Sequence, residues 1–213
     1  MCGKEISKMN EPSSTSPFWE KTYQDPTTST FGKPSAEIVE LAETFPRGAA
    51  VLDLGCGEGR NALFLAERGF DVSAVDISQH GIAKIRATAE RSGFKIRSQV
   101  ADMRTYELDR EYDLIISHGC LHLIERENWT NVLQRFKTHT RPGGYNVVAV
   151  FTDRIAPPPD LEAFCIGLFR EGELFAHYTD WTITQQKSYT INDEHPGGIR
   201  HTHPIDKIVA RRP

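Results

Sequence analysis

The chain has 213 residues, of which 38% are apolar and 25% charged, the balance of an ordinary globular protein with a substantial core. Its net charge of −4 argues against a broad basic surface, and so against binding to nucleic acid or to an anionic membrane. No apolar run approaches the roughly 18 residues of a membrane span, and the first residues lack the apolar core of a secretory signal.

The four cysteines, Cys2, Cys56, Cys120 and Cys165, are widely spaced and form no C-x-x-C pair. This spacing predicts neither a zinc ribbon nor a disulfide framework, and unpaired thiols are typical of a reducing compartment. We therefore expect a cytoplasmic protein that holds no metal.

Residues 1–16 are polar and are interpreted as a disordered tail, followed by a single domain over 17–213. The segment 17–33 carries Trp19, Tyr23 and Phe31 among polar residues and is interpreted as a lid, lying either on the domain edge or over a ligand. From residue 35 to about 151, amphipathic helical patterns alternate with short apolar runs. We expect helices at 35–45, 60–69, 78–91 and 125–139, and strands at 49–55, 71–76, 95–102, 111–118 and 145–151.

This alternation predicts an α/β fold with a doubly wound, mostly parallel sheet and right-handed crossovers. The last third differs: a short helix over 170–178 precedes two long strands, the first over 181–191 and the second ending at residue 211, with HPGG between them. Two strands joined by a short glycine-rich turn pair antiparallel, so we expect the sheet to end in a hairpin.

The most informative segment is VLDLGCGEGRN at residues 51–61, a glycine-rich loop between a strand and a helix. A P-loop would have G-K-[ST] after the glycines, where this chain has Arg60 and Asn61. A nicotinamide fingerprint would have its third glycine at position 60. In addition, the Asp53 carboxylate would repel a pyrophosphate, which makes a dehydrogenase a distant alternative. A ligand with a cationic amino group or sulfonium suits Asp53 better.

Two further carboxylates end the next two strands. Asp76 ends the second strand, where a carboxylate can bind both hydroxyls of a ribose, and Asp102 ends the third. The run of VLDLGCGEGRN, AVDIS, VADM, EYDLIISHGCLHLI and PGGYNVVAV resembles the successive motifs of class I S-adenosylmethionine-dependent methyltransferases, over about residues 36–151.

The resemblance implies a seven-stranded Rossmann-like sheet with its last strand antiparallel, and S-adenosyl-L-methionine as cofactor. It also implies roles for single residues. Gly55, Gly57 and Asp53 hold the methionine moiety, Asp76 the ribose hydroxyls and Asp102 the adenine amino group. Ile77 and Met103 flank the adenine ring, and the backbone near Ser117 lines the sulfonium end. The other expected cofactor contacts are Cys56, through its backbone, Arg60 and Asn61.

The methyl acceptor is expected to be a small molecule, because strand four reads SHGCLHL and lacks the (D/N)-P-P-(Y/F/W) tetrapeptide of many amino methyltransferases. The run FREGEL, followed by a tyrosine and a tryptophan, resembles the tellurite-resistance methyltransferases of the TehB type. That resemblance implies a tellurium or selenium oxyanion as acceptor, and related small enzymes methylate thiols. It also implies roles in substrate handling for His195 and Arg200. The second arginine of the family is missing, because Pro196 follows His195.

His118 is a third catalytic candidate, since it lies near the expected cofactor mouth. The alternative function is a non-catalytic S-adenosylmethionine-binding regulatory module, which would retain the same glycines and carboxylates. Partners are expected to be limited to the small molecule, in a monomer or homodimer.

Overall fold

In the computed structural model the described residues are 16–25, 32–157, 161, 165–195 and 199–213, without the side chains of 16–18 and 193–201. The elements are, in chain order, α1 (Ser16–Thr22), α2 (Ala36–Ala42), β1 (Ala50–Leu54), α3 (Arg60–Glu67), β2 (Asp71–Asp76), α4 (Gln79–Ser92), β3 (Arg97–Val100), β4 (Tyr112–His118), η1 (Leu121–Leu123), α5 (Arg126–His139), β5 (Thr140–Phe151), α6 (Glu173–Ala176), β6 (Thr182–His195) and β7 (Ile199–Arg211).

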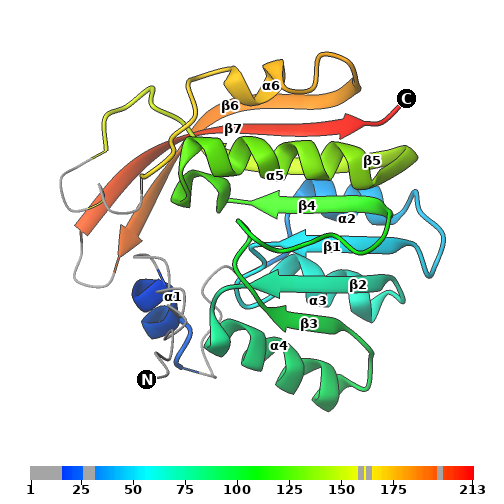
Figure 1. The fold of residues 1–213 in the computed structure, drawn as a ribbon. Coiled ribbons are helices and arrows are strands. Elements are labelled where there is room, and N and C mark those ends of the chain that lie inside the picture. The colour runs from blue at the N-terminus through cyan, green and yellow to red at the C-terminus, as the bar shows by residue number, and fades with distance from the viewer. Residues whose placement is uncertain (1–15, 26–31, 158–160, 162–164, 196–198) are drawn as a thin grey trace, which may run out of the picture.

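The seven strands form one sheet in the order β3-β2-β1-β4-β5-β7-β6 (Figure 1). Neighbours from β3 to β5 are parallel, whereas β7 is antiparallel to both β5 and β6. The predicted doubly wound sheet with a C-terminal antiparallel hairpin is confirmed.

Each face of the sheet has its own hydrophobic core, because successive strand residues point to opposite faces. In β1, Val51 packs with α2, α3 and α4, whereas Leu52 packs with η1, α5 and α6. All five residues of β1 are buried, as expected of a parallel strand covered on both sides. Among the described residues, every helix is too short or too polar to cross a lipid bilayer.

Local signals set the bounds of α4. The Ser78 side chain accepts a hydrogen bond from the Gly81 N–H at 3.0 Å, and Gly93 ends the helix in the left-handed conformation. Both bounds agree with the sequence prediction.

Several elements differ from the prediction, and the largest differences concern α1, α6 and β5. Residues 16–22 form the helix α1, although no helical period was evident in so short a segment. The helix α6 has four residues rather than nine. The strand β5 begins at Thr140 rather than at Tyr145, because a register shift opposite Tyr112 and Leu114 lets the Pro-Gly-Gly segment bulge within the strand.

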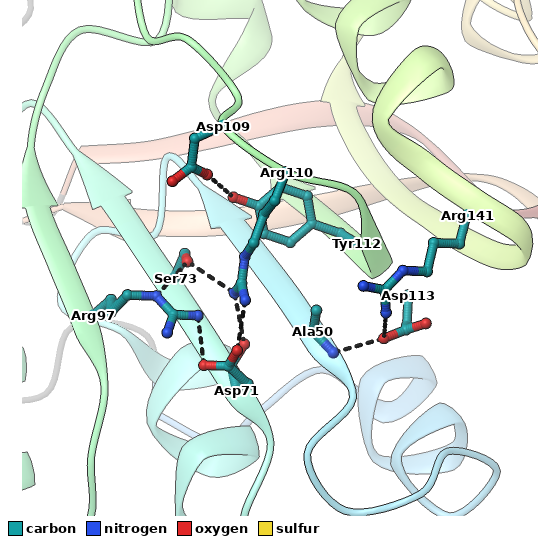
Figure 2. A network of polar contacts seen from close by, with 9 residues as sticks. All are labelled: Ala50, Asp71, Ser73, Arg97, Asp109, Arg110, Tyr112, Asp113 and Arg141. Carbon is teal, nitrogen blue, oxygen red and sulfur yellow. Dashed lines mark hydrogen bonds and ion pairs between the residues drawn. The ribbon is translucent and has the colours of Figure 1, made fainter.

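An arginine network ties together the amino ends of the strands (Figure 2). The Asp71 carboxylate at the start of β2 pairs with Arg97 and Arg110, each at 2.5 Å. Asp113 in β4 accepts from the Ala50 N–H of β1 at 2.7 Å. These contacts fix the amino edge of the sheet, at the opposite end of β2 from Asp76.

Candidate active site

A cavity of about 360 Å³ lies at the carboxyl ends of the strands, around the point where the strand order reverses between β1 and β4. This volume is in the range of small-molecule sites, roughly 300–1,000 Å³. Figure 1 shows this edge of the sheet: the arrowheads of β1–β4 point to it, and α1 lies on the same side of the molecule.

The glycine loop forms the floor of this cavity. Its backbone folds back onto β2, because the N–H groups of Gly55 and Cys56 both donate to the Val75 carbonyl. Gly57 has a φ of +55°, and a Cβ there would lie 2.6 Å from the Tyr23 hydroxyl oxygen. The loop therefore needs glycine both for its conformation and for the close approach of its neighbours.

Asp76 lies beside the loop at the end of β2. Its carboxylate accepts hydrogen bonds from the Gly57 N–H at 2.7 Å and from the Ser78 N–H at 2.8 Å. Burial raises the pKa of this carboxyl above its ordinary value, despite those two hydrogen bonds. The two bonds hold the carboxylate in place as part of the cavity wall.

Asp53 is the deepest carboxyl of the site, with 2% of its surface exposed. Burial raises its pKa to about 7, although the nearby Arg60 guanidinium lowers it. Near neutral pH this group therefore gains a negative charge in the cavity, which a cationic ligand group would stabilise.

Asp102 lines the third side of the cavity, just after β3. Burial raises the pKa of the Asp102 carboxyl, but hydrogen bonds from Arg104 outweigh it and bring the pKa below its usual value. Ile77 and Met103, which the resemblance assigns to the adenine ring, both line the same part of the cavity.

His118, at the end of β4, is held by a charged network. Its Nε2 lies 2.9 Å from the Glu37 carboxylate and its Nδ1 lies 3.1 Å from Arg60 Nη2. Because Arg60 can only donate, Nδ1 accepts and Nε2 carries the proton. Lys207 also donates to Glu37, at 2.8 Å. Burial lowers the pKa of His118, so the ring is neutral while both nitrogens are engaged.

The lid segment contributes two aromatic side chains to the cavity, Trp19 and Tyr23. Glu20 fastens α1 to the amino end of α4: its carboxylate accepts from the Ser78 hydroxyl, the Gln79 N–H and the His80 N–H at 2.7–3.0 Å. The predicted Phe31 of this segment lies outside the described residues.

Most other candidates also line the cavity, namely Gly55, Cys56, Arg60 and Asn61. Ser117 is expected to contribute only its backbone; its side chain is fully buried, its hydroxyl lies 3.1 Å from the Cys120 sulfur, and the backbone role stays a prediction. The next three residues, His118, Gly119 and Cys120, line the cavity.

The two remaining catalytic candidates lie in the hairpin. The backbone of Arg200 pairs with Glu194 and that of His195 with Ile199. Their side chains are outside the described part of the structure, so their proposed roles rest on the sequence.

Sequence reasoning missed Glu37 and Lys207 as parts of this site. Glu37 is separated from His118 by 81 residues and from Lys207 by 170. The only sequence signal is a carboxylate within the apolar stripe of α2, where a buried charge requires a partner.

Comparisons with known proteins agree with this architecture. The family model for "Tellurite resistance protein TehB" matches residues 15–197. A relative from Haemophilus influenzae, described as a probable S-adenosyl-L-methionine-dependent methyltransferase TehB, is 36% identical over 137 residues. The match covers 63% of this chain and 46% of that protein, so the chain spans about half the length of the curated relatives it matches.

A second relative is a 2-heptyl-1-hydroxyquinolin-4(1H)-one methyltransferase from Mycobacteroides abscessus, 33% identical over 62% of this chain and 58% of its own. Among solved structures, TehB from Haemophilus influenzae superposes with a TM-score of 0.75 and 26% identity, over 93% of this chain and 67% of its own. The family match and the shared sheet establish that the chain belongs to the TehB family and has the class I methyltransferase fold.

Proposed function

We propose that this chain transfers a methyl group from S-adenosylmethionine to a small-molecule acceptor. The observation that carries the proposal is that Asp53, Asp76 and Asp102, from the ends of three neighbouring strands, line one cavity that continues beyond them. Family membership supports the same donor.

The charged residues that line the cavity match the chemical groups of this cofactor. Asp53 is a buried carboxyl that a cationic amino group would stabilise in its charged form. Asp76 would accept from the ribose hydroxyls and Asp102 from the adenine amino group, while Arg60 would pair with the methionine carboxylate. The cavity thus offers a carboxylate to each hydrogen-bond donor group of the cofactor, and the Arg60 guanidinium to its carboxylate.

When bound, S-adenosylmethionine supplies an electrophilic methyl carbon on its sulfonium. The protein's task is then to hold an acceptor lone pair in line with the breaking bond, a contribution from positioning. His118 is proposed to position the Arg60 guanidinium rather than to remove a proton, since both its ring nitrogens are already engaged. Trp19 and Tyr23 would shield the reacting groups from water.

The acceptor is proposed to be a tellurium or selenium oxyanion or a thiol, with His195 and Arg200 orienting it. A small-molecule acceptor is supported by the relative that is named as a 2-heptyl-1-hydroxyquinolin-4(1H)-one methyltransferase.

Release of S-adenosylhomocysteine tests the proposal. The purified protein is incubated with S-adenosylmethionine and, in turn, with tellurite, selenite, thiols and halides. We expect release that depends on at least one of these acceptors. Binding of S-adenosylmethionine without release for any acceptor would favour the regulatory module instead.

A further inference from the structure

Beyond the cofactor residues, the cavity opens into an acceptor chamber built by η1, the end of β5 and the β6–β7 hairpin. Its walls are largely apolar side chains: Leu123, Ile124, Phe151, Ile191 and Ile205. Ile191 faces its cross-strand partner His203, so one face of the hairpin forms this wall.

Two histidines line the chamber, and both are buried against an aromatic ring. His122 stacks on Phe151 with ring centroids 4.0 Å apart, and His203 stacks on Phe151 at 4.5 Å. Both histidines are buried. The Phe151 N–H faces the Nδ1 of His122 at 3.4 Å, and burial lowers the pKa of His122 to about 3, so this ring is uncharged at neutral pH. Among the residues whose side chains the structure describes, an aromatic stack therefore lines this end of the cavity.

The described walls of this chamber suit a compact oxyanion poorly. Several strongly hydrated oxygens would each need a donor, and burying them without partners is costly. Among the described lining residues, Arg60 is the one arginine or lysine, and it is bonded to His118 at the tip of β4. The chamber instead offers apolar contact to a flat, polarisable molecule.

We infer that the acceptor is an apolar aromatic thiol, bound as its thiolate. The inference rests on the proposed methyl transfer. An aromatic thiol loses its proton to water near neutral pH, because its charge is spread over sulfur and ring, and it needs no general base. The thiolate sulfur then forms a bond to the methyl carbon while the carbon–sulfur bond of the sulfonium breaks. The products are an aryl methyl thioether and neutral S-adenosylhomocysteine, so the opposite charges cancel.

A series of 4-alkylthiophenols tests the inference, because lengthening the alkyl group adds apolar area with little change in thiol acidity. We expect kcat/KM for S-adenosylhomocysteine release to rise about two- to fourfold per methylene until the chamber is filled. We also expect each of these thiols to exceed tellurite and selenite. A higher kcat/KM for an oxyanion, or rates independent of alkyl length, would overturn the inference.

Two variants of neighbouring residues in β6 test whether the aromatic thiol binds in this chamber. Ile191→Ala removes apolar wall and should raise KM for 4-butylthiophenol about tenfold, with unchanged affinity for S-adenosylmethionine. Asn192→Ala changes the next residue, which is exposed and faces away from the chamber, and should leave KM unchanged. Equal KM values in both variants would contradict the chamber assignment.

The outcomes separate this inference from the function on which it depends. Failure to bind S-adenosylmethionine would contradict the proposed function, and the acceptor assignment with it. Binding of the cofactor with no release from any aromatic thiol would overturn the acceptor class alone.

Discussion

Asp53 links the charge of the cavity to pH. Because burial raises its folded-state pKa from 3.8 to about 7, the folded chain keeps a proton that the unfolded chain releases. The free energy of unfolding of the ligand-free protein should therefore fall as the pH rises from 3.8 towards 7. At about pH 8, Asp53→Asn should raise that free energy by up to about 4 kcal/mol. Urea denaturation at several pH values measures this.

The same variant should lose affinity for the cofactor. Wild-type affinity for S-adenosylmethionine should increase between about pH 6 and pH 7.5, as Asp53 ionises and attracts the ammonium group, and Asp53→Asn should remove that increase. Asp206→Asn is the matched control, since Asp206 is a buried carboxyl in β7 that bonds Ser188 and Gly172 away from the cavity. An identical pH dependence in Asp53→Asn and wild type would refute the role of Asp53.

His118 is predicted to act through Arg60. Its replacement by alanine removes the acceptor that holds the guanidinium, so we expect KM for S-adenosylmethionine to rise about tenfold, with a smaller fall in kcat. The control is His139→Ala, whose ring lies at the end of α5 beside the Arg135 carbonyl and outside the cavity lining. If His118 were instead a general base, its removal would abolish an ionisation in the pH profile of kcat. The fall in kcat would then be much larger than the change in KM.

At the scale of elements, α1 depends on one carboxylate. Glu20 bonds four groups at the amino end of α4, the His80 ring among them, at a helix end where a negative charge is favourable. Glu20→Gln should speed amide hydrogen exchange at Gln79 and His80 and weaken S-adenosylmethionine binding about three- to tenfold. Lys21→Gln, on an exposed position of the same helix, is the control. Unchanged exchange and affinity in Glu20→Gln would show that α1 is held by other contacts.

Elements with local signals could be predicted from the sequence, and elements with distant partners could not. Ser78 and Gly93 bound α4 by hydrogen bonds within the helix termini, and the glycine loop follows from its spacing. By contrast, α1 has seven residues and is held by a hydrogen bond between Glu20 and Ser78. These two residues are 58 positions apart in the sequence. The same holds for His118 in β4, whose partners Glu37 and Arg60 come from the helices α2 and α3.

Across the whole molecule, the two edges of the sheet differ in charge. At the amino edge, arginines surround Asp71, and they lower its pKa against the effect of burial (Figure 2). At the carboxyl edge, Asp53, Asp76 and Asp102 line the cavity, and the first two have raised pKa values because of burial. The strand β2 thus carries a structural aspartate at its start and a proposed ligand-binding aspartate at its end.

The central claim is that S-adenosylmethionine binds at the carboxyl ends of the strands, beside Asp76. Calorimetric titration of S-adenosylmethionine into the wild type, Asp76→Ala and Asp71→Ala tests it most directly. Loss of two hydrogen bonds to the ribose predicts a Kd raised about 100-fold or more in Asp76→Ala. Asp71→Ala, which alters the far end of β2, should bind as the wild type does. Equal affinity in Asp76→Ala and wild type would contradict the proposed cofactor site.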